Sequence, residues 1–529
     1  MEKQSENIST SSAGTSSGSS PVTSNRAKIY QLVLFPMNNG ATNVYYILTM
    51  NFIAYYANGV LGLLLAFATT MVTLMRVLDA FIDPVIGAIM DRTSTRWGKF
   101  RPFMVLGNGI MIVASLIMFF GLRLIPENVM WLRYICYTLF YILYMVGYTF
   151  QTSVTRSGQT CLTNDPKQRP LFTIFNTVAS LIGMGLVQFL APLITGGDYT
   201  SETFFNIMIP LAIVVSAVMT ILAVIGIAEK DQPKYFGIGG GSGKEKVKVK
   251  EYVAILRANK ELQRLMVAGA GCKLAFSIAT NMTVLSMLYG AMMGDYGGLY
   301  LPMMIVGYVF SVPFFLLTVR TSQKKGQKAS LVFYTKIALV MYVGVLVLLL
   351  FWQQGAASVN LSLRHINIYT VLYILFFGIG YGAYYATADM PIPMVADCSD
   401  YETFRSGRYI PGIIGTLFSL VDKLVSSLGS TVVGLAVTAI GLSKLPDGTT
   451  PYSEGMHVLV ILLFCIVPMI AWIATLVAMR GYKLTGARMK EIQAVNAVRR
   501  DAVNKGMDVQ EALSKWKDIG DVPEEFRQG

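Results

Sequence analysis

Residues 76–102 read RVLDAFIDPVIGAIMDRTSTRWGKFRP, an apolar run with three embedded charges that leads into a basic loop. Arg76, Asp79 and Asp83 are spaced three and four residues apart, so a helix places all three on one face. At 1.5 Å of rise per residue, Asp79 lies about 18 Å from the polar end of the run, and Asp83 about 12 Å. Charges at such depth in a bilayer usually face a partner or a water-filled path. The stretch therefore predicts a membrane-spanning helix with an ion-binding or ion-paired cluster.

The composition extends this interpretation to the whole chain. Of 529 residues, 54% are hydrophobic and 14% are charged, against roughly 25% charged residues in soluble proteins. At about 20 residues for each membrane-spanning helix, this composition allows about twelve spans. It excludes a soluble enzyme, a disordered chain and a disulfide-rich secreted domain.

Apolar runs recur twelve times, and a long basic segment separates the sixth from the seventh. They cover residues 30–58, 61–90, 102–122, 130–160, 171–195, 204–228, 262–290, 298–319, 329–352, 367–396, 411–441 and 456–480. This pattern predicts an all-α integral membrane protein with two six-helix halves. The expected parts are a polar tail at 1–28, a first half at 29–228, a basic linker at 229–261, a second half at 262–481 and a tail at 482–529.

The basic residues indicate the orientation of the chain in the membrane. The chain carries 43 Lys and Arg against 30 Asp and Glu, and the loops after the even-numbered runs hold most of the basic residues of the loops. The positive-inside rule then places both termini in the cytoplasm. The net positive charge indicates contact with anionic lipid headgroups rather than with nucleic acid. In the C-terminal tail, Met489, Ile492, Val495 and Val498 recur at helical spacing among basic residues. This predicts an amphipathic helix on the membrane surface.

Two loops of the predicted halves resemble each other. DRTSTRWG at 91–98 and VRTSQKKG at 319–326 are identical at four of eight positions. Repeated six-helix halves are typical of major facilitator transporters, in which the substrate binds near the midplane between the halves. The sequence therefore predicts the twelve-helix major facilitator fold.

The charges inside the predicted spans are candidate site residues. Asp79 and Asp83 can bind a hard cation through oxygen or exchange protons; alternatively, Arg76 neutralises one of them in a structural cluster. Lys423 lies twelve residues after Pro411 and reaches a similar depth. Its ammonium group can occupy the site when the cation is absent, or form a fixed salt bridge, for example with Asp422.

Charges at the cytoplasmic ends of the spans predict an inner gate. The basic loop of the first half and the acidic segment after the tenth span would face each other if the halves are repeats. Opposite charges there would close the cytoplasmic side when the outside is open, with about 0.2–1 kcal/mol for each exposed pair. The predicted gate consists of Asp91, Arg92, Arg96, Lys99, Arg101, Asp397, Asp400 and Glu402.

The motif at 76–102, together with MVADCSDYE at 394–402 and the pair Asp422-Lys423, resembles the glycoside–pentoside–hexuronide:cation symporter family, typified by melibiose permease. The resemblance covers the transmembrane core and implies sugar uptake coupled to H⁺, Na⁺ or Li⁺. It implies that Asp79 and Asp83 are the cation-site carboxylates and that Lys423 is the lysine of the eleventh span.

The sugar-binding part of that pattern is altered in this chain. Asn43 stands where sugar-binding members carry Asp, Thr152 and Arg156 stand at the family's Asp and Trp positions, and Asn176 lies near its arginine position. The changed residues, with Lys273 added, shift the site towards positive charge and favour an acidic sugar such as a uronide, whereas Asp389 acts in the opposite direction. The substrate-binding candidates are Asn43, Arg76, Thr152, Arg156, Asn176, Lys273 and Asp389.

The coupling ion is expected to be H⁺ rather than Na⁺. Two aspartates four residues apart in a partly dry site should retain one proton by mutual repulsion. Thr149 and Thr152 are the candidate neutral oxygens if the ion is Na⁺, and Thr149 is included in the cation site.

The expected function is cation-coupled symport of a sugar, glycoside or sugar acid across the cell membrane by alternating access. The protein is expected to act as a monomer without a cofactor. The alternatives are a lipid or lysolipid symporter of the same fold and a sensor or partner protein that transports nothing. An enzyme is not expected, because the sequence has no nucleophile–base or metal-binding constellation.

Overall fold

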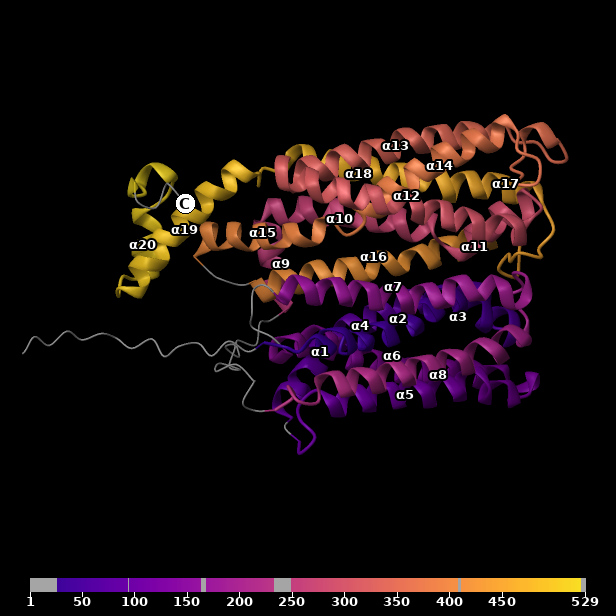
Figure 1. The fold of residues 1–529 in the computed structure, drawn as a ribbon, viewed down its shortest axis with the longest axis horizontal. Coiled ribbons are helices and arrows are strands. Elements are labelled where there is room, and N and C mark those ends of the chain that lie inside the picture. Colours follow the sequence, from indigo (N-terminus) through magenta and orange to yellow (C-terminus); the bar gives the residue numbers. More distant parts are fainter. Residues whose placement is uncertain (1–25, 94, 163–167, 233–248, 408–410, 525–529) are drawn as a thin grey trace, which may run out of the picture.

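The computed structural model describes residues 26–93, 95–162, 168–232, 249–407 and 411–524. Within these ranges the regular secondary structure is helical, apart from one isolated bridge between Thr95 and Gly98, and loops connect the helices. Figure 1 shows two bundles that lie side by side, formed by the first and the second half of the sequence, with the C-terminal helices projecting from one end. The predicted N-terminal tail lies almost entirely outside the described residues.

The N-terminal bundle contains five long helices and one segment of short helical pieces. The short pieces are α1 (Ile29–Leu34), α2 (Met37–Ile47), the π-helix η1 (Leu48–Phe52), α3 (Ile53–Tyr55) and the π-helix η2 (Tyr56–Val60). The long helices are α4 (Leu65–Arg92), α5 (Arg101–Phe119), α6 (Met130–Leu162), α7 (Gln168–Thr195) and α8 (Glu202–Ile227). Short 3₁₀ turns η3 (Gly121–Leu124) and η4 (Glu127–Val129) join α5 to α6.

The C-terminal bundle follows the short helix α9 (Val249–Ala258). Its helices are α10 (Lys260–Ala279), α11 (Met282–Ser286), η6 (Met287–Met292), α12 (Tyr296–Lys325), α13 (Gln327–Phe351), η7 (Ala357–Val359), α14 (Ile368–Thr387), α15 (Pro391–Ser406), α16 (Pro411–Ala439), α17 (Glu454–Val460), η8 (Ile461–Ile466) and α18 (Val467–Gly481). The tail contains α19 (Gly486–Asn504), α20 (Val509–Lys515) and η9 (Ile519–Asp521).

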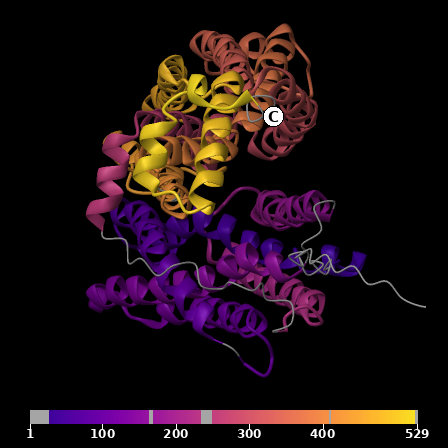
Figure 2. The same cartoon turned by 90° about the vertical axis from the view of Figure 1, so that its left-hand side faces the viewer.

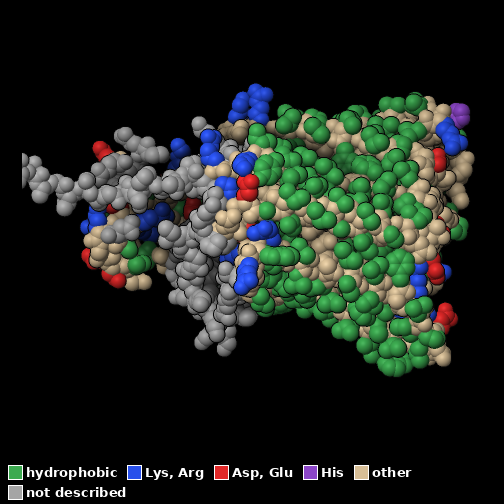
Figure 3. Space-filling view, turned by 60° about the horizontal axis from the view of Figure 1, so that its bottom comes forward, with side chains coloured by type: hydrophobic (Ala, Val, Ile, Leu, Met, Phe, Trp, Pro, Cys, Tyr) green, Lys and Arg blue, Asp and Glu red, His purple; other side chains and the backbone are tan. Residues whose placement is uncertain are grey.

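Ten helices of the described residues are long and apolar enough to cross a membrane, or eleven if the pair α10 and α11–η6, bent by 43°, is one span. The predicted span at 30–58 does not meet this test because α and π turns divide it into short pieces. Hydrophobic side chains cover the middle of the bundle in Figure 3, and Lys and Arg gather at the end that carries the tail. This distribution fits a bilayer around the bundle.

The tenth predicted span extends beyond the membrane. Helices α14 and α15 together cover 39 residues, Ile368–Ser406, or about 58 Å at 1.5 Å per residue, against about 30 Å of hydrocarbon. They are separated by a turn at 388–390, directly before Pro391. The end of α15 therefore projects from the bundle and offers a surface for other parts of the chain.

The C-terminal tail uses that surface. Met489, Ile492, Val495 and Val498 of α19 are all buried, and α19 packs against α15 and α20. The prediction that this helix lies on the membrane surface is wrong, because its apolar face is covered by protein. The physical reason is the projecting α15, which cannot be inferred from the tail alone.

Close packing of α2 against α7 depends on two glycines. A Cβ atom on Gly183 would collide with the carbonyl oxygen of Gly40, whereas a Cβ on Gly185 would meet only Phe189 at 3.6 Å. Backbone atoms cannot move aside as a flexible side chain can. Gly183 therefore cannot be replaced by a larger residue unless α2 and α7 move apart.

We predict that Gly183→Ala lowers the thermal unfolding midpoint of the detergent-purified protein by several degrees, in line with overpacking costs of about 1–3 kcal/mol. Gly185→Ala on the same helix is the matched control and should leave the midpoint nearly unchanged. Equal midpoints for the two variants would contradict the close approach of α2 and α7.

Candidate functional site

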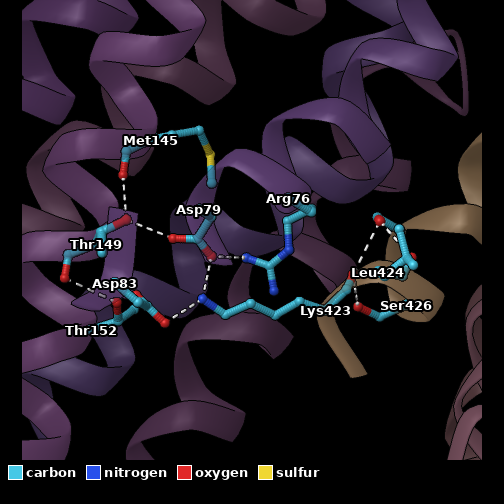
Figure 4. Close-up of polar contacts among 10 residues, drawn as sticks. Arg76, Asp79, Asp83, Met145, Thr149, Thr152, Lys423, Leu424 and Ser426 are labelled. Atoms are coloured by element: carbon cyan, nitrogen blue, oxygen red, sulfur yellow. Dashed lines mark hydrogen bonds and ion pairs between the residues drawn. The ribbon is translucent and has the colours of Figure 1, made fainter. Parts of the chain in front are cut away.

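A cluster of charged side chains joins the two halves where α4 packs along α16 (Figure 4). The helical spacing places Arg76, Asp79 and Asp83 on the same side of α4, as predicted. Lys423 reaches across from α16, and its Nζ lies 2.8 Å from Asp79 Oδ2 and 2.5 Å from Asp83 Oδ2. The lysine therefore bridges two carboxylates of the other half and does not pair with its neighbour Asp422.

Asp79 is the most fully satisfied member of this cluster. Arg76 Nη1 lies 3.2 Å from its Oδ2, and the Thr149 hydroxyl on α6 donates to its Oδ1 at 2.6 Å. Arg76 also stacks on Tyr46 and Tyr148, at 5.3 Å and 5.8 Å from the ring centroids. Asp79 is fully buried, and a buried carboxylate is stable only when paired in this way.

The formal charges of this cluster cancel. Two cations, Arg76 and Lys423, balance the two carboxylates. The expectation that mutual repulsion of Asp79 and Asp83 retains a proton rests on an isolated pair of acids, and that premise is wrong here. The sequence places Lys423 at a similar depth but leaves open whether it reaches these carboxylates or pairs with Asp422, and tertiary packing brings it to the carboxylates.

A second charged cluster lies entirely in the C-terminal half. Lys273 on α10 contacts Asp389 Oδ1 at 2.8 Å and Asp422 Oδ1 at 3.8 Å. Asp389 occupies the turn between α14 and α15, and its side chain is 68% exposed; Asp422, on α16, is 32% exposed. One lysine against two carboxylates gives this cluster a formal charge of −1. The partnership of Asp422 with Lys273 was missed by sequence reasoning, because only the fold brings α10 and α16 together.

The other substrate candidates lie in the N-terminal half. The Asn43 side chain donates to the Asn39 carbonyl at 2.7 Å, and the Asn39 amide donates to the Asn176 carbonyl at 3.3 Å. Thr152 donates to the Thr149 carbonyl at 3.2 Å. The structure thus links Asn43 to Asn176 through Asn39, a residue that sequence reasoning missed. Arg156 belongs to α6, but its side chain lies outside the described residues.

The described contacts of the predicted gate residues lie within their own half. Backbone N–H groups of Lys99, Phe100 and Arg101 donate to the Asp231 carboxylate at 2.7–3.0 Å, and Arg101 Nε lies 3.5 Å from the same carboxylate. Asp231 thereby satisfies the N-terminus of α5. This role of Asp231, just after α8, was missed. Arg96 is exposed, and the side chains of Asp91 and Arg92 lie outside the described residues.

The acidic gate residues are held by the C-terminal half and the tail. Asp400 Oδ2 accepts a hydrogen bond from Gln493 of α19 at 3.2 Å, and Glu402 contacts Asn259 at 2.9 Å and Arg405 at 2.7 Å. Asp397 lines a cavity of about 420 Å³ between α15, α19 and the α12–α13 connection. The structure therefore does not bring the described basic and acidic gate residues together.

The halves are joined at the end of the bundle away from the tail. The Tyr55 hydroxyl contacts the Pro446 carbonyl at 2.5 Å, Asn58 donates to the Ser443 carbonyl at 3.1 Å, and Gly448 N–H donates to the Gly197 carbonyl at 3.0 Å. The Thr73 hydroxyl on α4 lies 2.7 Å from that of Thr431 on α16. Along α4 and α16, these contacts lead to the Lys423 bridge.

Comparison with known proteins identifies the family of the chain. The family described as MFS/sugar transport protein matches residues 35–486. The putative glycoside/cation symporter YagG of Escherichia coli K12 is 25% identical over 84% of this chain and 89% of its own length. The lactose permease of Lactobacillus helveticus is 23% identical over 79% of this chain, which spans 64% of that relative's length. The isoprimeverose transporter of Lactiplantibacillus pentosus is 23% identical over 77% of this chain and 79% of its own.

Solved structures share the fold. A D-xylose–proton symporter superposes with a TM-score of 0.56 at 14% identity, covering 84% of this chain and 97% of its own. A bacterial homologue of the iron transporter ferroportin, in its inward-facing state, superposes with a TM-score of 0.53 at 13% identity, covering 86% and 97%. The predicted major facilitator fold is therefore confirmed.

The charge balance at Lys423 predicts a compensating pair of substitutions. Lys423→Met should lower the thermal unfolding midpoint strongly, since removing one partner from a buried pair costs about 3–5 kcal/mol. Adding Asp83→Asn should recover part of the loss, because Arg76 and Asp79 then remain balanced. Lys336→Met, at an exposed position of α13, serves as the control. A double variant no more stable than Lys423→Met would contradict the bridge.

Proposed function

The chain belongs to the MFS/sugar transport protein family, and from that premise we propose that it carries a sugar or glycoside across the cell membrane together with a monovalent cation. The family and the multi-pass helical fold make the chain a membrane transporter rather than an enzyme. The observation that carries the finer proposal is the bridge from Lys423 in one half to Asp79 and Asp83 in the other.

This bridge supports a physical mechanism of coupling. The Lys423 ammonium group neutralises the two carboxylates at the position where an incoming cation would do the same. Cation and lysine therefore compete for the same oxygens. When the cation displaces Lys423, α4 and α16 lose an ionic contact between the halves. Cation binding thereby changes the relative free energies of the two access states, which is the requirement for coupled transport.

The cation site combines carboxylate and hydroxyl oxygens. Thr149 Oγ1 lies 2.6 Å from Asp79 Oδ1, so a hard cation would find three oxygen-bearing side chains there. A proton needs only one carboxylate. Both H⁺ and Na⁺ satisfy this chemistry, and the gradient experiment below separates them.

The second charged cluster supports a substrate rich in hydroxyl groups. Asp389 and Asp422 have exposed carboxylate surface, and carboxylates accept strong hydrogen bonds from hydroxyl groups. The positive charge of Lys273, which favoured an acidic sugar in the sequence, is outweighed by these two acids. We therefore propose a neutral sugar or glycoside. The amides of Asn43 and Asn176 and the Thr152 hydroxyl would provide contacts from the N-terminal half.

The orientation proposed from the sequence also assigns the access state. Lys and Arg gather at the end of the bundle that carries the tail (Figure 3), which supports cytoplasmic termini. The contacts at Tyr55, Asn58 and Gly448 then lie at the outer end. With the outer end joined, the proposed state is inward-facing. A single chain contains both halves and the bridge, which supports a monomer as the working unit.

The function is tested with purified protein in liposomes. A thermal-shift screen of neutral sugars, glycosides and uronides identifies a ligand, and its uptake is then driven by a Na⁺ gradient or a pH gradient, with and without a protonophore. We expect Asp79→Asn and Asp83→Asn each to abolish uphill accumulation, because the cation loses a carboxylate. Asp501→Asn, on the tail, should accumulate normally.

Three outcomes of this experiment are informative. Accumulation driven by Na⁺ at constant pH with the protonophore present assigns Na⁺; accumulation that the protonophore removes assigns H⁺. Normal uphill accumulation in both aspartate variants would overturn the cation-site assignment. Binding of a sugar without any uptake would favour a sensor.

Asp389→Asn should separate substrate recognition from coupling. Loss of a hydrogen bond to a charged group costs about 1.5–3 kcal/mol, so the sugar KM should rise about tenfold or more, with the half-saturating cation concentration unchanged. Thr149→Val should show the reverse pattern, because it alters only the cation site. An effect of Asp389→Asn on cation dependence alone would place that residue in the ion path.

A further inference from the structure

The C-terminal helices lie outside the part of the chain that matches the family. That match ends at residue 486, the first residue of α19. Figure 2, which views the molecule from the end that carries the tail, shows the yellow C-terminal helices in front of the C-terminal bundle. The contacts of α19 and α20 with the rest of the chain therefore indicate what these helices do.

The tail is firmly attached to the end of α15. Arg499 donates to the Phe404 carbonyl at 2.6 Å and, through two nitrogens, to the Trp516 carbonyl, at 2.9 Å and 2.5 Å. Its guanidinium group also lies 5.1 Å from the centroid of the Phe404 ring. Together with the buried apolar face of α19, these bonds join α15, α19 and the residues after α20 into one unit.

The same helix holds a charge that the sequence assigns to the inner gate. Gln493 Nε2 donates to the Asp400 carboxylate at 3.2 Å, and Asn496 Nδ2 donates to the Asp400 carbonyl at 2.9 Å. The N-terminal half has a matching arrangement, in which Asp231 binds Arg101 and the start of α5. Each half thus holds gate residues through contacts of its own.

We propose that α19 is an autoinhibitory latch that holds Asp400 away from the basic loop of the N-terminal half. Closing the inner end requires the Asp400 carboxylate to pair with a basic residue of that loop, and this pairing competes with the bond from Gln493 to the same carboxylate. Interactions present in one state and absent from the other shift the equilibrium between the states by their free energy. The latch thereby slows the return step of the transport cycle. Its effect on turnover rests on the proposed transport function, whereas its effect on conformation does not.

The test changes the latch without removing the tail. Gln493→Glu places a second carboxylate beside Asp400, and Gln493→Ala removes the donor without adding charge. Gln510→Glu introduces the same charge at an exposed position of α20 and is the matched control. Spin labels at Trp97→Cys and Lys324→Cys, both exposed and neither assigned to the gate, report the distance between the inner ends of the two halves by pulsed electron resonance in the full-length protein.

For Gln493→Glu we expect about a two- to tenfold shift in population towards short distances, as the loss of one hydrogen bond predicts, and a smaller shift for Gln493→Ala. Sugar turnover should rise in the same order, while Gln510→Glu matches the parent. Unchanged distance distributions in both Gln493 variants would overturn the latch. If no sugar is transported by any variant, the proposed function fails, but the distances still decide the latch.

Discussion

Two carboxylates in the interior of a membrane bundle must be neutralised, and much of this structure follows from how that is done. Asp79 and Asp83 lie on α4, and the charge that balances them comes partly from Arg76 on the same helix and partly from Lys423 on α16. Because Lys423 belongs to the other half, the neutralisation is also a contact between the halves. Because an unpaired buried charge is costly, this contact stabilises the arrangement in which α4 and α16 meet.

The two charged clusters are connected through one helix. Asp422 and Lys423 are neighbours on α16, so their side chains point in different directions, about 100° apart around the helix. Lys423 faces the N-terminal half, whereas Asp422 faces Lys273 within its own half. A displacement of α16 that releases Lys423 also moves Asp422. This arrangement connects the Lys423 bridge to Asp422 and Lys273 through a single helix.

The end of the bundle that carries the tail is organised by different contacts. There Asp231 and Glu402 are buried and bonded within their own halves, and Asp400 accepts a hydrogen bond from α19. At the opposite end, direct contacts of Tyr55, Asn58 and Gly448 join the two halves. Contacts within each half therefore organise one end of the bundle, whereas contacts between the halves join the other end.

The sequence by itself determined the helical membrane fold, its two halves and the positions of the buried charges. Periodicity and charge cost are local properties, so the face shared by Arg76, Asp79 and Asp83 follows from spacing alone. The tertiary structure decided which charges pair. Lys423 bridges two aspartates more than 300 residues away, Lys273 is outweighed by Asp389 and Asp422, and α19 rests on α15 rather than on lipid. Pairing depends on the distance between side chains from different helices, and that distance exists only once the bundles have packed.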